Sequence, residues 1–413
     1  MRYSLLGCAA ILALGACGST EPDGPPPLLA ALPRALSPAE LRLAEATNGF
    51  AFALLREATR EAPAESNTFL SPLSASMALG MTLNGAGGET FDAMRATLGL
   101  EGMTEAEIDQ AYRDLIELFR GIDRRAEILV ANSLWAREGL PLEPAFADAG
   151  REYFDAEIRT LDFATPGAVE SINDWVAGKT NGRIPRVLDA IAQDEVLFLI
   201  NAIYFKGRWR EAFDPRNTDT GPFHGADGRE RSAPLMHQEA TLHYTETERY
   251  QAVDLLYGNG AFAMAVVLPR AGGTPGELLA SLDPASWHDL VAGLREETVN
   301  LTLPRFRLDY SRRLDPDLGA LGMGIAFDPG RADFFRIADV RPDRLFISRV
   351  EQKTFVEVNE EGTEAAAATT VAIGVTSAPQ TYEMRVDRPF LFAIRERFSG
   401  TLVFVGVMNA IGG

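Results

Sequence analysis

Apolar residues in the first third of the chain recur every three or four positions, which is the spacing of one face of an α-helix. The first such run, residues 43–54, follows the tetrapeptide Ser37-Pro38-Ala39-Glu40. Ser37 can cap this helix, Pro38 suits its first turn, and Glu40 is placed to bond back to the cap. Further helices are expected to begin where a hydroxyl-bearing residue precedes an apolar run, at Ser71, Thr90 and Thr104.

Apolar residues in the remainder of the chain gather in shorter runs, several with alternating polar positions, which is typical of β-strands. Residues 195–205 are apolar nearly throughout, which indicates a strand buried on both faces. Helices that dominate the first third and strands that dominate the last half predict an α+β fold with large antiparallel sheets. The expected strands are residues 126–135, 195–205, 261–268, 298–303, 355–358, 390–394 and 401–408.

The segment "EEGTEAAAATTVAIGVTSAPQ", residues 360–380, fits neither pattern. Four consecutive alanines favour a helix, whereas the β-branched residues after them favour a strand. No charged residue occurs between Ala365 and Gln380, and no proline occurs between Gly362 and Ala378. On these residues alone, a flexible alanine-rich linker, a helix and an unpaired strand all remain open.

The N-terminus has the features of an export signal. Arg2 provides positive charge, and Leu5 to Leu14 form an apolar core that is too short to span a bilayer. The core ends in Leu14-Gly15-Ala16-Cys17, which resembles the lipobox of bacterial lipoproteins. We therefore expect residues 1–16 to be a removed signal peptide, Cys17 to carry the lipid, and residues 17–36 to contain a flexible tether. An ordinary cleaved signal, giving a secreted protein, is the alternative.

Gly18, rather than an aspartate, follows the expected lipidation site. By analogy with lipoprotein sorting, this favours anchoring in the outer membrane, outside the cytoplasm, over retention at the inner membrane. The net charge of −19 makes nucleic acid an improbable partner.

Sites for enzymatic chemistry are scarce in this sequence. Four histidines occur, none in a metal-ligand spacing, and after lipidation of Cys17 the mature chain has no free thiol. There is no Gly-x-Ser-x-Gly elbow and no Walker lysine. We therefore expect a protein that is not an enzyme and that has neither a cofactor nor a bound metal. The histidines are His224, His237, His243 and His288.

Four stretches, in this order along the chain, resemble signatures of the serpin family of serine protease inhibitors. They are "NTFLSPLSASMALGMTL" at residues 67–83, "NAIYFKGRW" at 201–209, "VNEEGTEAAAATT" at 358–370 and "VDRPFLFAI" at 386–394. The resemblance covers about residues 38–411, although Arg385 stands where a glycine is usual. It implies one domain, residues 37–413, with about nine helices around three antiparallel-rich β-sheets. It also implies an exposed reactive-centre loop at about residues 360–385.

The resemblance implies a suicide-substrate mechanism, in which a protease cleaves the loop and forms an acyl-enzyme. The N-terminal part of the loop then inserts into the main sheet as a new strand and traps the protease, which makes the native fold metastable. If Thr363 faces inward in an inserted strand, every second residue after it does so too, while Glu364 faces solvent. The expected partner is a serine protease in covalent complex with a monomer. The hinge residues are Glu360, Gly362, Thr363, Glu364, Ala365, Ala366, Ala367 and Ala368.

By similarity, the bond that the protease cuts is Thr376–Ser377, with Val375 and Ala378 as the alternatives. Each choice offers a small uncharged side chain, which suits an elastase-like or subtilisin-like protease rather than a trypsin-like one. A cross-class inhibitor of papain-like cysteine proteases and a non-inhibitory binding or structural lipoprotein are the alternative functions.

The family also has a polar "shutter" beneath the main sheet, where strands must part, and a "breach" where insertion begins. Ser71, Ser74 and Asn201 match the shutter, and Trp209 matches the tryptophan of the breach. Gln352 stands where the family usually has a histidine. A glutamine can donate and accept hydrogen bonds but cannot titrate.

Overall fold

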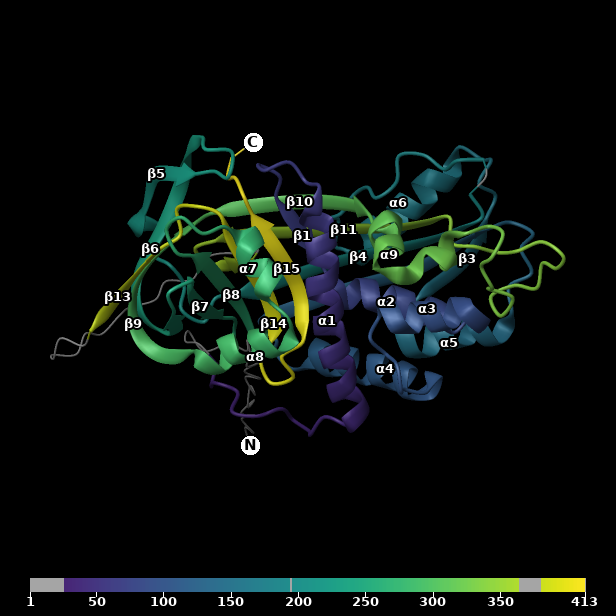
Figure 1. Cartoon of the computed structure of the whole chain (residues 1–413), viewed down its shortest axis with the longest axis horizontal. Coiled ribbons are helices and arrows are strands. Elements are labelled where there is room, and N and C mark those ends of the chain that lie inside the picture. Colours follow the sequence, from purple (N-terminus) through teal and green to yellow (C-terminus); the bar gives the residue numbers. More distant parts are fainter. Residues whose placement is uncertain (1–25, 194, 364–379, 413) are drawn as a thin grey trace, which may run out of the picture.

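A computed structural model describes residues 26–193, 195–363 and 380–412. This part of the chain contains nine α-helices and has the expected α+β class (Figure 1). The helices are α1 (Pro38–Arg60), α2 (Pro72–Leu83), α3 (Gly88–Thr97), α4 (Glu105–Gly121), α5 (Pro144–Phe154), α6 (Gly167–Lys179), α7 (Pro275–Ser281), α8 (Pro284–Gly293) and α9 (Asp315–Leu318). In the described residues, no helix has both the length and the apolar character that a membrane crossing requires.

The expected capping signals operate at three helices. Ser37 and Glu40 form a capping box at α1, Thr104 forms another at α4, and the Ser71 side chain caps α2. The prediction for α3 is wrong by two residues, because this helix begins at Gly88 rather than Thr90. The Thr90 hydroxyl instead accepts a hydrogen bond from the Asp333 amide at 3.0 Å, so its side chain serves a tertiary contact.

The smaller sheet has six strands in the order β10-β11-β12-β4-β2-β3, and β11 also pairs directly with β4. It extends along the long axis of the molecule, with α2–α5 at one end and β5, β6, β9 and β13 at the other (Figure 1). The strands of the smaller sheet are β2 (Ala126–Arg137), β3 (Glu157–Leu161), β4 (Leu197–Arg208), β10 (Phe306–Arg313), β11 (Arg349–Asn359) and β12 (Gly362–Thr363).

The larger sheet joins nine described strands, although we expected three sheets in all. The cause is the 17-residue strand β6, which pairs with β5 and β9 along most of its length and with β7 at its end. One continuous ladder thus merges two of the expected sheets. Its strands are β1 (Thr68–Leu70), β5 (Thr218–His224), β6 (Glu230–Glu246), β7 (Tyr250–Leu256), β8 (Phe262–Pro269), β9 (Arg295–Pro304), β13 (Thr381–Arg385), β14 (Phe390–Glu396) and β15 (Leu402–Met408).

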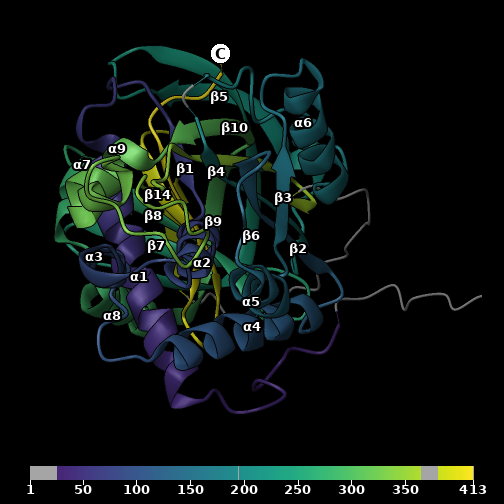
Figure 2. The same cartoon turned by 90° about the vertical axis from the view of Figure 1, so that its right-hand side faces the viewer.

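Strand β4 is buried on both faces, as its continuous apolar run predicted. Its even-numbered residues, such as Phe198 and Ile200, pack in a small cluster with Ile172 and Val176 of α6. Its odd-numbered residues, such as Leu199, belong to the main core with α2, whose residues are all buried. Figure 2 shows α6 and the helices α2, α4 and α5 on different sides of this sheet. A residue entering beside β4 therefore meets the main core or the α6 side according to its parity.

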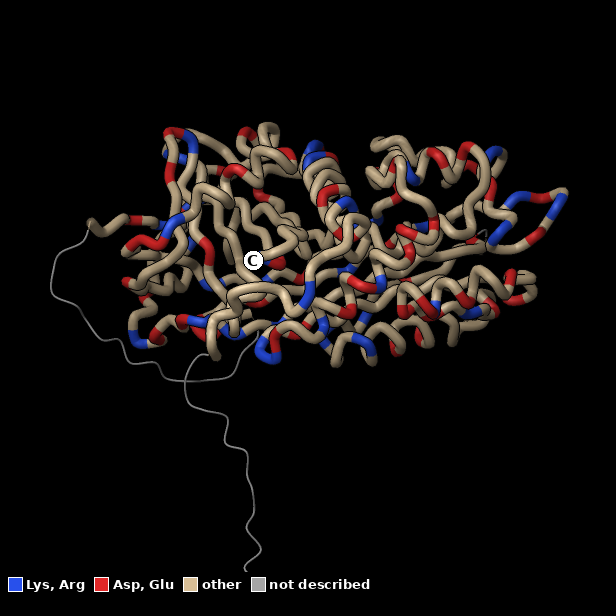
Figure 3. The backbone as a smooth tube through the Cα atoms, turned by 90° about the horizontal axis from the view of Figure 1, so that it is seen from below, with Lys and Arg blue, Asp and Glu red and all other residues tan. Residues whose placement is uncertain are grey.

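Charged residues of both signs occur throughout the described chain. Acidic and basic positions alternate along the tube in Figure 3, and most ion pairs involve exposed side chains. Such exposed pairs contribute little to stability. The interleaving is consistent with the net charge of −19 being distributed rather than gathered into one patch.

Candidate functional site

Strands β11 and β4 lie side by side in parallel over most of their length, with Arg349 opposite Phe198 and Phe355 opposite Tyr204. Beyond this stretch the two strands separate around β12, the short strand that begins the hinge. β12 is antiparallel to both neighbours, with Thr363 opposite Val358 on β11 and Gly207 on β4. The hinge has therefore already started a strand between β11 and β4, and β12 ends at Thr363.

The proposed reactive bond falls outside the described residues. This applies to Thr376 and Ser377, to the alternatives Val375 and Ala378, and to the hinge residues from Glu364 through Ala368. The chain is described again from Gln380, and β13 then forms an edge of the larger sheet beside β9. The geometry of the site is therefore built from the two ends of the loop.

Gly362 lies at a position where a residue with a Cβ atom would not fit. Its φ angle is 147°, and a Cβ atom there would come within 2.1 Å of the Gly207 carbonyl oxygen and 2.8 Å of the Arg208 Cα. Glycine is thus required by the close approach of β12 to β4 as well as by the backbone freedom expected of a hinge.

Thr363 faces the main core and is fully buried, which is the condition under which every second residue after it would face inward in an inserted strand. Its hydroxyl shares a hydrogen bond of 2.7 Å with the hydroxyl of Tyr257, a residue that the sequence did not single out. The Tyr257 ring stacks on Trp209, with 4.4 Å between ring centroids. Trp209 therefore lies at the point where the hinge enters the sheet, which is where its proposed breach role would place it.

Glu360 holds the start of the hinge against the body of the protein. Its side chain is 5% exposed and accepts hydrogen bonds from Thr218 and from Arg305, whose Nε lies 2.7 Å from Oε1. Burial pushes the pKa of Glu360 upward, but the hydrogen bonds from Arg305 and Thr218 outweigh burial and lower the pKa. The carboxylate is thus held charged between the junction of β9 with β10 and the first residue of β5, and neither partner was predicted.

The four residues matched to the shutter meet in one buried hydrogen-bond network. The Gln352 amide accepts from the Ser71 backbone N–H at 3.0 Å and donates to the Ser71 carbonyl at 2.9 Å. It also donates to Asn201 Oδ1 at 3.0 Å, across the contact between β11 and β4. Asn201 in turn donates to the carbonyl and hydroxyl of Ser74, and to Asn132 on β2 at 2.7 Å.

This network ties α2 to the strands that an insertion would have to separate. The single side-chain bond between Gln352 and Asn201 crosses the boundary at which β11 and β4 would part. Asn132 was missed because a lone asparagine within an apolar run carries no signal of its own; its partner is 69 residues away.

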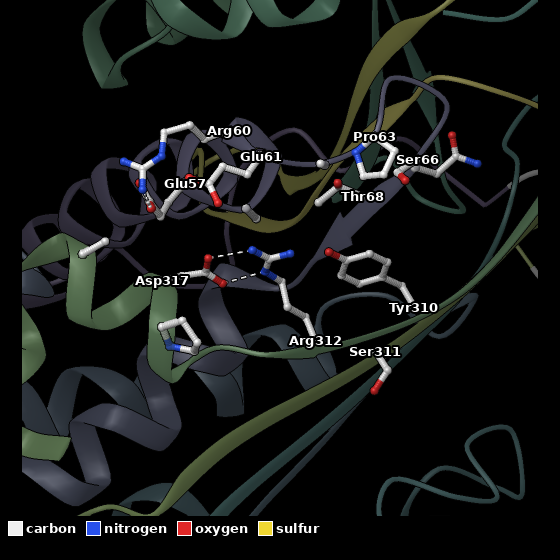
Figure 4. Close-up of a pocket in the computed structure, with 15 residues that line it drawn as sticks. Glu57, Arg60, Glu61, Pro63, Ser66, Thr68, Tyr310, Ser311, Arg312 and Asp317 are labelled. Carbon is white, nitrogen blue, oxygen red and sulfur yellow. Dashed lines mark hydrogen bonds and ion pairs between the residues drawn. The ribbon is translucent and has the colours of Figure 1, made fainter. Parts of the chain in front are cut away.

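One surface cleft among the described residues was a candidate for catalytic chemistry. A cleft of about 550 Å³ lies between the end of α1, β1, β10 and α9, and Arg312 is held there by two hydrogen bonds of 2.6 Å to Asp317 (Figure 4). No histidine or cysteine lines this cleft, so its serines have no Ser–His pair of the kind that activates a nucleophile. In residues 26–193, 195–363 and 380–412, no three His, Cys, Asp or Glu side chains are placed to hold a metal ion.

Comparison with known proteins decides the family. A family model described as "Serpin (serine protease inhibitor)" matches residues 45–410. The chain belongs to the serpin family. Iripin-2 of Ixodes ricinus is 34% identical over 380 residues, which cover 90% of this chain and 94% of Iripin-2.

Solved serpin structures share the fold described above. The thermophilic serpin Tengpin in its native state has a TM-score of 0.84 at 27% identity, covering 94% of this chain and 97% of its own. Thyroxine-binding globulin in complex with thyroxine has a TM-score of 0.81 at 25% identity, covering 90% of this chain and 100% of its own. The serpin fold is thus confirmed, in a family of protease inhibitors that also includes a ligand-binding member.

Proposed function

We propose that this serpin irreversibly inhibits serine proteases with elastase-like or subtilisin-like specificity, as a suicide substrate. The protease serine oxygen attacks the Thr376 carbonyl carbon, the Thr376–Ser377 bond breaks, and Ser377 leaves as a protonated amine. The acyl group of Thr376 remains bound to the protease as an ester. Insertion of the cleaved loop between β11 and β4 then prevents hydrolysis of that ester.

The observation that carries this proposal is the register of β12. Thr363 lies opposite Gly207 on β4 and Val358 on β11, so the same register can be continued residue by residue. Glu364, the one charge in the inserting half, would then lie between Lys206 of β4 and Glu357 of β11. Since even-numbered positions face the α6 side, Glu364 avoids the main core.

The same register supports the proposed position of the cut. Continued to the ends of the neighbouring strands, the new strand would place Ile373 opposite Leu197 of β4 and Ala372 opposite Arg349 of β11. The ester at Thr376 would follow a few residues later, beyond the end of the sheet. A dozen new ladder hydrogen bonds, at about 1 kcal/mol net each, would supply a drive on the order of 10 kcal/mol.

Insertion would also exchange one buried hydrogen bond for another. Thr369 would come to lie opposite both Asn201 and Gln352, whose direct bond insertion must break. A threonine hydroxyl both donates and accepts, so it can satisfy the two separated amides. The inward residues on either side of Thr369 are the small Ala365 and Ala367 and the β-branched Val371 and Ile373.

The chain is further proposed to act as a monomer outside the cytoplasm, tethered through lipid on Cys17 to the outer membrane. The signal-like residues 1–16 and the absence of cysteines beyond Cys17 support this proposal. Mass spectrometry of the mature N-terminus would test it. A diacylglyceryl-modified Cys17 is expected, and an unmodified N-terminus would instead indicate the secreted form.

A non-inhibitory binding role is the second candidate, because Gln352 replaces the usual shutter histidine and the fold is shared with a thyroxine-binding serpin. The hinge composition favours inhibition over this role. Inhibition of papain-like cysteine proteases would use the same insertion with a thioester in place of the ester.

Inhibition is tested by mixing the purified protein with pancreatic elastase and running a denaturing gel. We expect a covalent band larger than elastase, together with loss of elastase activity. The variant Thr376→Arg should lose this activity and gain a complex with trypsin, since trypsin needs a basic residue before the cut. Clean cleavage of the loop with active elastase left over would refute inhibition of this class.

A further inference from the structure

The hydroxyl of Tyr257 meets the hinge at a fully buried position. Tyr257 and Thr363 are both 0% exposed, and their oxygens lie 2.7 Å apart. The ring is fixed by stacking on Trp209 and by an edge-on contact with Phe205, whose centroid is 4.9 Å away. The aromatic ring therefore cannot turn its hydroxyl elsewhere without disturbing two packed neighbours.

Residue 207 of β4 must be small for this contact to exist. A Cβ atom on Gly207 would lie 2.6 Å from the Tyr257 ring, so the glycine lets the ring lie flat beside β4. Trp209 completes the arrangement, because its backbone N–H donates to the Glu361 carbonyl and its indole N–H to the Asn359 carbonyl, both at 2.9 Å. The hinge backbone is thus held by Trp209, and Tyr257 holds its first inward side chain.

A ladder of backbone hydrogen bonds does not by itself set the register of the incoming strand. A slip of two residues keeps every side chain on the same face, and a run of alanines offers little to tell one register from the next. The hydroxyl of Thr363 does distinguish them, because a slip of two would put the methyl group of Ala365 against the Tyr257 hydroxyl and leave that hydroxyl unpaired.

We propose that Tyr257 is a positioning residue that sets the register of loop insertion through its hydrogen bond to Thr363. The effect of Tyr257 on inhibition rests on the proposed inhibitory function, whereas the hydrogen bond itself is present in the native state. Because β12 already has this register, Tyr257 holds the first step of insertion in place before any protease arrives. Burial raises the pKa of Tyr257, so its hydroxyl keeps its proton at physiological pH.

The outcome of cleavage would then depend on the hydroxyl groups of Tyr257 and Thr363. When insertion starts in the wrong register or late, the acyl-enzyme has time to hydrolyse, and the inhibitor is consumed as a substrate. The measured quantity is the stoichiometry of inhibition, the number of inhibitor molecules used per protease inactivated.

The variants to compare are Tyr257→Phe, Thr363→Val, Thr363→Ser and the double variant Tyr257→Phe/Thr363→Val. The single variants that lose a hydroxyl should raise the stoichiometry by about five-fold, the effect of one net hydrogen bond. Thr363→Ser should remain near wild type because it keeps the hydroxyl. Tyr112→Phe is the matched control, since Tyr112 is also buried but donates to the Ser76 carbonyl, remote from the hinge.

The double variant distinguishes an effect on the register of insertion from an effect on the stability of the native fold. It leaves no buried hydroxyl unpaired, so its melting temperature should recover towards that of the wild type, while its stoichiometry should stay raised. A purely structural role predicts the opposite pattern, with both quantities recovering together. An unchanged stoichiometry in Tyr257→Phe would overturn the proposal while leaving the inhibitory function intact.

Hydrogen exchange in the uncleaved protein tests the positioning role of Tyr257 without any protease. Hydrogen exchange at the amides of Gly362 and Thr363 should be about five-fold faster in Tyr257→Phe than in wild type, and unchanged in Tyr112→Phe. If the wild type forms no covalent complex but this acceleration is seen, the inhibitory function fails and the positioning of the hinge by Tyr257 stands. Equal exchange in the two proteins would refute the positioning role.

Discussion

Replacing Glu360 by glutamine should loosen the hinge without changing its shape. The carboxylate accepts hydrogen bonds from Arg305 and Thr218 and is 5% exposed, whereas the Arg305 side chain is 42% exposed. A hydrogen bond to a charged group contributes about 1.5–3 kcal/mol, and solvent around Arg305 reduces that value. Because glutamine keeps one acceptor oxygen, we expect a loss of about 1.4 kcal/mol, which is a ten-fold rise in the population with an open hinge.

Hydrogen exchange measures this population directly, at the backbone amides of residues 359–363. Exchange should be about ten-fold faster in Glu360→Gln than in wild type. Glu105→Gln is the control. Glu105 likewise accepts two hydrogen bonds from one arginine, Arg336, but it lies on α4 and not at the hinge. Equal exchange in Glu360→Gln and wild type would show that the carboxylate does not hold the hinge.

Acid should reproduce the effect of Glu360→Gln. The pKa of Glu360 is lowered in the folded protein, so the stabilisation by its carboxylate is complete above the unfolded pKa of about 4.3. It is lost as the pH falls through the lower folded value. Hinge exchange, corrected for its intrinsic pH dependence, should therefore rise in acid for the wild type and stay constant for Glu360→Gln. A parallel rise in both proteins would assign the effect to another group.

Three further changes have defined outcomes. Gln352→Leu leaves the Ser71 backbone N–H and the Asn201 side-chain oxygen without their partners, whereas the Ser71 carbonyl still accepts from the Ala75 N–H. It should lower the free energy of unfolding by about 2–4 kcal/mol in urea denaturation, and an unchanged midpoint would contradict the network. Burial raises the pKa of Asp109 to about 6, so the stability of the wild type should fall as the pH rises from about 4 through 6. Asp109→Asn should not show this fall, and at pH 8 it should melt about 3 °C above the wild type. If the variant also melts above the wild type at pH 4, the difference has another cause. Thr363→Arg would place an unpaired charge at a position that is fully buried already before cleavage, so it should displace β12 and turn the inhibitor into a substrate on a denaturing gel. Undiminished complex formation would count against insertion.

Local features of the fold could be predicted from the sequence because their causes are local. The capping boxes at Ser37 and Thr104 depend on residues three positions apart, and the burial of β4 on both faces follows from its own composition. Strand alternation relates Thr363 to the residues after it, but only the structure shows that Thr363 itself is buried. The start of α3 was misplaced because the role of Thr90 is set by a distant amide, that of Asp333.

Partners that meet only in the folded chain could not be predicted. Tyr257 and Thr363 are 106 residues apart, and Arg305 and Glu360 are 55 apart, so no spacing relates them. The union of two expected sheets also depends on how far the pairing of β6 extends, which is a tertiary property. The motifs identified the segments of the site, whereas the contacts that hold them depend on sheet register.

The central claim is that the cleaved loop enters between β11 and β4, and a distance measured across that boundary tests it most directly. Spin labels on Glu127→Cys of β2 and Ser311→Cys of β10, both exposed, would flank the boundary on a sheet with no cysteine of its own. After cleavage within residues 364–379 by any protease, the label distance should increase by about 5 Å, the spacing of one added strand. An unchanged distance in fully cleaved protein would contradict insertion.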